Sequence, residues 1–149
     1  MPKRSRRTKA QVDTLVSLEE AASQLERDVV GLLKTAHLSA AQFNVLRILR
    51  GAGPAGATCG QIGERLIRHD PDVTRLVDRL LRRGLVARDR DAKDRRIVRT
   101  RITRKGFEIL AGLDAPLDAL HERQFGHLSE RQLTDLRDLS TLLQARQRR

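Results

Sequence analysis

The sequence predicts a mainly α-helical protein with one small β-hairpin, an α+β fold. Three observations predict it. Apolar residues recur every three or four positions along most of the 149-residue chain, which is the period of an amphipathic helix. At three points where such a pattern begins, Ser or Thr is followed three residues later by Gln, a helix-starting capping box. Two short runs rich in branched residues flank a polar turn, as the strands of a hairpin do.

The first two helices are predicted over residues 10–36 and from Ser39 onward. Helical spacing of apolar residues marks the first of them. Ser39 and Gln42 form the capping box of the second. The second helix should end before residues 51–56, because this stretch is rich in Gly and Pro.

Two further helices should lie close together in a helix-turn-helix arrangement. Thr58 and Gln61 form a capping box that starts a short helix. Asp70 is a good N-cap for the next helix, with Pro71 at its first position and Gly84 as its C-terminal stop. One face of this helix is apolar and should point inward: Val73, Leu76, Val77, Leu80 and Leu81.

A β-hairpin and two long helices complete the chain. Residues 85–90 and 97–102 are the predicted strands, with a polar turn between them. Thr103 should cap the fifth helix, and Pro116 should kink or interrupt it. Ser129 begins the last helix.

The net charge of +11 is concentrated in a few segments. Residues 58–106 carry +8 and residues 1–9 carry +5, whereas residues 107–145 carry −4. An apolar fraction of 39% is enough for a core, so the chain is not a disordered polycation. The localised excess predicts a polyanionic partner, nucleic acid first and an anionic membrane surface second. With aromatics at only 2%, base stacking on aromatic platforms is excluded as the mode of recognition, and no aromatic belt is left for a membrane interface.

The residue types that would support catalysis or metal binding are scarce. Cys59 is the single cysteine, so no internal disulfide can form, and we expect a reducing, cytoplasmic compartment. We interpret Cys59 as a small packing residue, although a helix N-terminus can also activate a thiol. The sequence has no secretory signal, membrane-length apolar run, zinc spacing, phosphate loop or nucleophile–base pair. We therefore expect no enzyme activity, cofactor, metal or membrane partner.

The order of elements between residues 39 and 102 is that of a winged helix-turn-helix, in which the second helix of the turn enters the major groove of duplex DNA. The outward face of that helix offers Thr74, Arg75, Arg79 and Arg82. Arginine makes bidentate contacts to guanine or phosphate, so we expect these four residues to bind DNA. The alternative is an ordinary solvated face with charge pairs along the helix.

The sequence resembles the MarR family of bacterial transcription regulators. The resemblance rests on residues 38–49, 70–88, 94–96 and 102–106, four motifs in the family's order. It implies a homodimer that binds a palindromic operator on double-stranded DNA, typically as a repressor. It also implies that a small-molecule effector can release the DNA, although this sequence does not identify one.

The resemblance assigns residues in the hairpin to DNA binding. Arg95 and Arg96, with Lys93, would form the tip of a wing that inserts an arginine into the minor groove. Asp94 would hold the wing's geometry, with Arg88 as its candidate partner. The alternative for residues 94–96 is a plain polar turn.

The resemblance also divides the chain into functional regions. Residues 10–36 and 104–149 would form a helical dimerisation region, residues 37–103 the DNA-binding domain, and residues 1–9 a basic, disordered arm that could also follow DNA. Leucines at helical spacing fit a dimer seam, although they would also suit a core within one chain. The candidate seam residues are Leu15, Leu133, Leu136, Leu139 and Leu143.

Two further questions stay open at this point. His37 and His121 could line an effector pocket near the first and fifth helices, or simply be satisfied by neighbouring groups. The main rival to a sequence-specific regulator is a basic nucleoid-associated or RNA-binding protein without sequence preference. It would share the charge but would need neither a wing motif nor a leucine seam.

Overall fold

The computed structural model describes residues 6–68, 70–91 and 94–147 and confirms a mainly helical fold with one hairpin. No helix in these ranges is long and apolar enough to cross a membrane. In chain order the elements are α1 (Arg6–Lys34), α2 (Ala40–Ala52), η1 (Gly53–Ala55), α3 (Cys59–Arg65), α4 (Val73–Arg82), β1 (Val86–Arg90), β2 (Val98–Ile102), α5 (Arg104–Phe125) and α6 (Glu130–Gln147).

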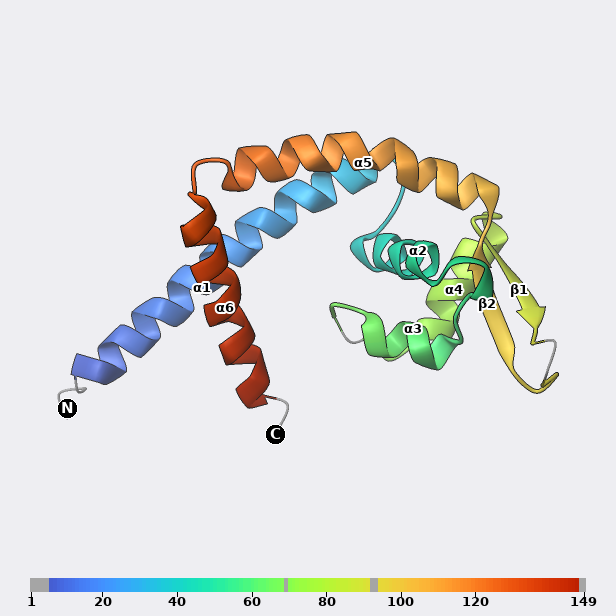
Figure 1. Ribbon diagram of the computed structural model, residues 1–149, viewed down its shortest axis with the longest axis horizontal. Coiled ribbons are helices and arrows are strands. Elements are labelled where there is room, and N and C mark those ends of the chain that lie inside the picture. Colours follow the sequence, from blue (N-terminus) through green and yellow to red (C-terminus); the bar gives the residue numbers. More distant parts are fainter. Residues whose placement is uncertain (1–5, 69, 92–93, 148–149) are drawn as a thin grey trace.

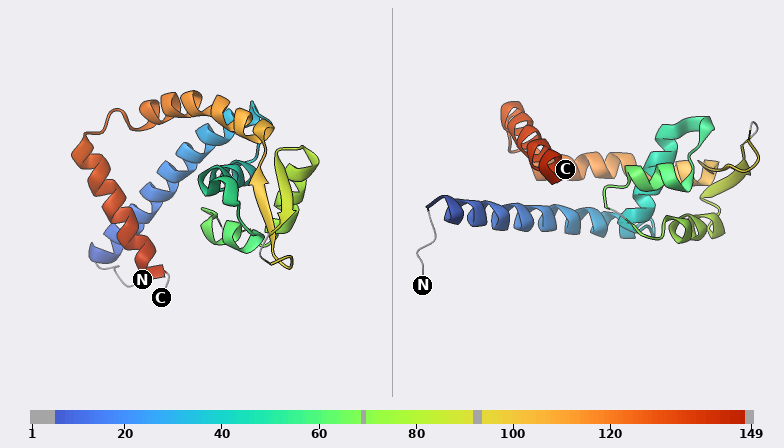
Figure 2. Two further views of the ribbon diagram at one scale, coloured as in Figure 1. Left: turned by 45° about the vertical axis from the view of Figure 1, so that its right-hand side comes forward. Right: turned by 90° about the horizontal axis from the view of Figure 1, so that it is seen from below.

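The molecule has a compact end and an extended end. Helices α2, α3 and α4 gather with the hairpin into a winged unit, which we define as residues 39–102 (Figure 1). Helices α1, α5 and α6 form a helical arm that projects away from it. Helix α6 crosses α1 in Figure 1, but the view from below in Figure 2 separates the two. Helices α1 and α6 therefore stand apart at the far end of the arm, which is open.

The predicted helix starts are largely confirmed. Ser39 and Thr58 each accept a hydrogen bond from the backbone N–H three residues on, and the Gln at that position returns one. Thr103 caps α5 by accepting from Gly106 N–H. Ser129 and Gln132 make the same reciprocal bonds before α6. Local sequence therefore sets where four of the helices begin.

The start of α4 was predicted two residues too early. The N-cap is Asp72, whose carboxylate accepts from Arg75 N–H at 3.1 Å. Asp70 instead accepts from Asp72 N–H at 2.8 Å and makes a turn that contains Pro71. Leu81 was also misplaced, because its side chain is exposed rather than facing inward.

Two expectations about the long helices are corrected. The basic arm was expected to be disordered through residue 9, but α1 already begins at Arg6, in a stretch that contains neither Gly nor Pro. Residues 1–5 lie outside the described part of the chain. Pro116 was expected to kink or interrupt α5, and an interruption is wrong, because the helix is continuous through this residue. Burial of Leu113 and Leu117 on either side holds this segment against the core.

One hydrophobic core joins the winged unit to the base of the arm. It takes buried residues from α1, α2, α3, α4, β1 and α5, including Leu33, Leu46, Ile62, Leu80 and Leu110. The two strands pair antiparallel, with Val86 opposite Ile102 and Arg90 opposite Val98. Ala57 adds an isolated bridge to Thr100, which attaches the loop before α3 to the edge of the hairpin. The wing is thus anchored at its base and projects at its tip.

Candidate nucleic-acid interface

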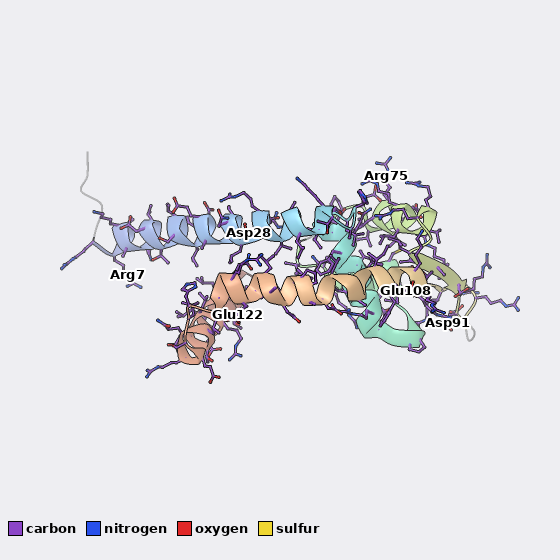
Figure 3. All side chains as sticks on the ribbon, turned by 90° about the horizontal axis from the view of Figure 1, so that it is seen from above. Arg7, Asp28, Arg75, Asp91, Glu108 and Glu122 are labelled. Atoms are coloured by element: carbon purple, nitrogen blue, oxygen red, sulfur yellow. The ribbon has the colours of Figure 1, made fainter. Side chains whose placement is uncertain are left out.

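Helix α4 presents a charged outer face above a buried inner face. Leu76, Val77 and Leu80 are buried, which fixes the rotation of the helix about its axis. The four side chains predicted to contact DNA all lie on its exposed surface: Thr74, Arg75, Arg79 and Arg82. Figure 3 shows Arg75 at the end of the molecule opposite Arg7. Helix α4 therefore offers a cationic ridge of the width that a major groove accepts.

Asp78 and Arg88 connect this helix to the first strand of the wing. Arg88 Nη1 lies 2.6 Å from Asp78 Oδ1, and both side chains are about one-third exposed or less. Arg88, the candidate partner of Asp94, pairs with Asp78 instead, so the candidate pairing is wrong. Asp78 lies on the side of α4 that faces β1, so it reaches Arg88 first. The pair fixes the orientation of the hairpin relative to the outer face of α4.

Asp91, which was not predicted, organises the turn of the wing. Its carboxylate pairs with Arg99 on the opposite strand and also accepts from Asp94 N–H at 3.2 Å. Asp89 pairs with Arg101 one step nearer the base, at 3.4 Å. Asp89 lies on β1 and Asp91 just after it, and Arg99 and Arg101 lie two residues apart on β2. This spacing signals cross-strand pairing, but the register places Asp89 opposite Arg99, so the observed ion pairs are the diagonal ones.

Asp94 supports the wing through the backbone instead of through an ion pair with Arg88. Its carboxylate accepts from Arg96 N–H at 3.0 Å, which closes a tight turn. Arg95 and Arg96 are both exposed at this turn. Lys93, predicted to join them, lies outside the described residues. The two described arginines therefore stand at the tip of a wing whose backbone is held by carboxylates.

The arm carries apolar side chains that nothing in the described chain covers. Leu15 on α1 is 56% exposed and Leu139 on α6 is 61% exposed. A groove of about 660 Å³ lies between the two helices and is lined mainly by leucines of α6 together with Thr14 and Leu18. All five leucines predicted for the dimer seam are exposed: Leu15, Leu133, Leu136, Leu139 and Leu143. They do not form a core within one chain, which was the alternative.

Known proteins share this architecture. The model of the MarR family matches residues 38–98, which cover most of the winged unit. A crystal structure of a MarR transcription factor from Planctomyces limnophilus has 34% sequence identity, a TM-score of 0.68, and an alignment over 95% of this chain and 99% of its own. The chain belongs to the MarR family.

Two other relatives extend the comparison of this MarR-family protein. The HTH-type transcriptional regulator YkoM of Bacillus subtilis is 39% identical over 89 residues, which span 59% of this chain and 56% of that protein. A mutant MarR from E. coli, complexed with operator DNA, is 24% identical over 93% of this chain and 99% of its own, with a TM-score of 0.79. The second likeness shows that the fold is shared.

Cavities in this MarR-family chain lie where the winged unit meets the arm. One of about 390 Å³ is lined mostly by apolar residues of α1, α2, α5 and the segment after α3, with five polar residues among them: Glu26, Asn44, Arg68, His121 and Gln124. His121 also lines a neighbouring cavity of about 410 Å³. His37, the other predicted pocket residue, instead ends α1 with a positive φ of 54°. Cys59 is partly buried at the first position of α3 and packs against the core.

Proposed function

We propose that this protein is a homodimeric repressor that binds a palindromic operator on double-stranded DNA. One observation carries the proposal. The exposed Thr and Arg side chains of α4 lie on the same unit as a wing tipped by Arg95 and Arg96, and Asp78–Arg88 connects the two. Arginines on a helix suit base edges and phosphates of the major groove, and arginines on a wing suit a narrow minor groove. A bacterial regulator of this kind acts on the chromosome in the cytoplasm.

The homodimer follows from the open end of the arm. Exposed leucines on α6 border the groove between these helices, together with Thr14 and Leu18 of α1. A second copy related by a two-fold axis would cover these surfaces with the same residues. We assign residues 10–36 and 104–149 to this dimerisation region and residues 37–103 to DNA binding. The two recognition helices would then lie about 34 Å apart, one turn of DNA.

Release by a small ligand is the regulatory part of the proposal. The 390 Å³ cavity touches α1 and α5 of the arm as well as α2 and the segment after α3. Its lining is mostly apolar, which suits a small-molecule site, and its polar groups are Glu26, Asn44, Arg68, His121 and Gln124. A ligand held there would contact both parts of the molecule. It would favour a different angle between them and so a different spacing of the two recognition helices.

Selection of DNA from a random pool tests the proposed function. The full-length protein is incubated with randomised duplexes, and the bound fraction is amplified and sequenced over several rounds. We expect an inverted repeat whose half-site centres are about 10 base pairs apart, bound by two chains. A pool that stays random would contradict sequence-specific binding. It would favour a nucleoid-associated or RNA-binding protein.

A further inference from the structure

Arg83 links the end of the recognition helix to the end of α1. It follows directly after Arg82, the last residue of α4. Its Nη1 donates to the carbonyl oxygen of His37 at 2.7 Å, and its Nη2 donates to that of Ala36 at 3.3 Å. These partners lie 46 and 47 residues away in sequence, at the C-terminal end of α1. One guanidinium group therefore bridges the winged unit and the helical arm.

The geometry at the end of α1 explains why these two carbonyls accept from Arg83. His37 has a positive φ, and its N–H donates to Lys34 O while Leu38 N–H donates to Leu33 O. This is a Schellman motif, which satisfies carbonyls of the last helical turn. The carbonyls of Ala36 and His37 follow these in the chain, and they accept from Arg83. A cation placed there also interacts favourably with the helix dipole.

A second helix of the arm, α5, holds the same turn. Lys105 Nζ donates to the carbonyl of Arg83 at 3.0 Å. Thr103 donates its hydroxyl to Gly84 O at 2.8 Å and its N–H to Leu85 O at 3.0 Å. A Cβ on Gly106 would collide with Leu85 O, so only glycine permits this approach of α5. Two of the three arm helices, α1 and α5, thus converge on the C-terminal turn of α4.

Two ion pairs also join the arm to the winged unit, and both are at least partly exposed. Arg50 Nη1 on α2 lies 2.9 Å from Asp114 Oδ2 on α5, with the two side chains 33% and 49% exposed. Arg68 Nη2 lies 2.6 Å from Glu26 Oε2 on α1, and the Arg68 side chain is 78% exposed. Water and salt screen exposed pairs, so the pair with Glu26 contributes little to holding the winged unit against α1. Of the two links to α1, Arg83 is the more effective, because it binds backbone groups that α1 itself fixes.

We propose that Arg83 is a positioning residue that sets the angle of α4 relative to the arm, and through it the spacing of the two recognition helices. The inference rests on the proposed homodimer. Arg83 makes its two hydrogen bonds to the protein backbone, so it acts on DNA binding through the position of α4. Loss of Arg83 should lower the affinity for DNA with two half-sites far more than the affinity for DNA with one half-site. Once one subunit has bound its half-site, binding of the other subunit to the second half-site depends on the spacing of the two recognition helices.

The test compares Arg83→Gln with the full-length wild type on two duplexes. One is the two-half-site duplex selected by the wild type, and the other has one half-site scrambled. We expect affinity for the first to fall roughly tenfold, which is typical of coupling between sites, and affinity for the second to change less than about twofold. Arg83→Lys, which can keep one of the two bonds, should lie between wild type and Arg83→Gln.

The matched control is Arg104→Gln, because Arg104 lies nearby on α5, is 93% exposed and pairs within its own helix with Glu108. It removes the same charge without cutting the link, so both affinities should stay unchanged. Equal losses for Arg83→Gln on both duplexes, with a shallower salt dependence, would show instead that Arg83 contacts phosphate. Unchanged affinity on both would show that the link does not position α4.

A second readout needs no DNA. Spin labels are attached at Glu64→Cys on α3 and Ala119→Cys on α5 in a Cys59→Ser background, diluted with unlabelled chain. We expect Arg83→Gln to broaden or shift the distance distribution between the labels, and Arg104→Gln to leave it unchanged. An identical distribution for Arg83→Gln would overturn the proposal. If the wild type selects no DNA sequence, the proposed function fails, yet this measurement still decides whether Arg83 holds the joint.

Discussion

Arg96 allows a test of the wing at the level of one side chain. Its backbone N–H donates to Asp94, and alanine keeps that bond, so Arg96→Ala should remove the side chain without opening the turn. We expect binding to the selected operator to weaken about tenfold, as for the loss of one arginine contact to a groove. Fluorescence anisotropy with a labelled duplex measures it.

Arg131→Ala on α6 is the charge-matched control for this wing substitution. The Arg131 side chain is 92% exposed and belongs to α6, the helix at the far end of the arm in Figure 1. It should leave operator affinity unchanged. Equal affinity of Arg96→Ala and wild type would mean that the wing tip does not contact DNA.

Asp91 should matter more for wing stability than its neighbour Asp89. The Asp91 side chain is 17% exposed and serves both Arg99 and the backbone of the turn, whereas the Asp89 side chain is 52% exposed. We expect Asp91→Asn to weaken the wing by about 1 kcal/mol and Asp89→Asn by less than about half of that. Hydrogen exchange of the amides of β1 and β2 measures the difference. Equal protection in the two variants would contradict the role given to Asp91.

Sequence reasoning at the residue scale found the exposed arginines but not their partners. Burial of Leu76, Val77 and Leu80 follows from spacing alone, so the outward position of Arg75 and Arg79 could be predicted. The choice of Asp78 over Asp94 for Arg88 depends on how β1 packs against α4. Tertiary packing sets the distance between Asp78 and Arg88, and the local sequence pattern contains no information about it.

At the scale of elements, a substitution on α6 tests the proposed dimer most directly. Leu139 is 61% exposed in the single chain, so Leu139→Asp should leave the fold of one chain intact. A charge placed in an apolar seam that a second copy buries is costly. We expect the dimer dissociation constant to rise at least a hundredfold, measured by sedimentation equilibrium.

Thr141→Asp is the control on the same helix, two residues further along and so on the opposite side of α6 from Leu139. It introduces the same charge and should keep the wild-type association. A Leu139→Asp variant that associates like the wild type would show that α6 is not in the interface. Circular dichroism confirms that both variants keep their helix content.

The elements themselves were mostly predictable, because capping residues act within four positions of where they stand. Ser39, Thr58 and Thr103 mark their helices correctly for this reason. The misplaced start of α4 is also a local matter. Asp70 and Asp72 can both cap a helix, and the turn around Pro71 decides between them. Pro116 is accommodated in a continuous helix because the leucines around it are buried.

At the scale of the whole molecule, charge and apolar surface are separated. The segment with +8 contains α4 and the wing, while the acidic segment with −4 contains most of α5 and α6. This division could be predicted by counting residues along the sequence. The angle between the winged unit and the arm could not, because it depends on contacts such as Arg83 with α1, made between residues more than 40 positions apart.

The ratio of specific to non-specific affinity tests the central claim most directly. Wild-type protein is titrated against its selected operator and against a scrambled duplex of equal length and composition, at several salt concentrations. We predict that the operator binds at least about a thousandfold tighter near physiological salt, while both affinities fall steeply as salt rises. Equal affinity for the two duplexes at every salt concentration would contradict the account and leave only a non-specific cationic protein.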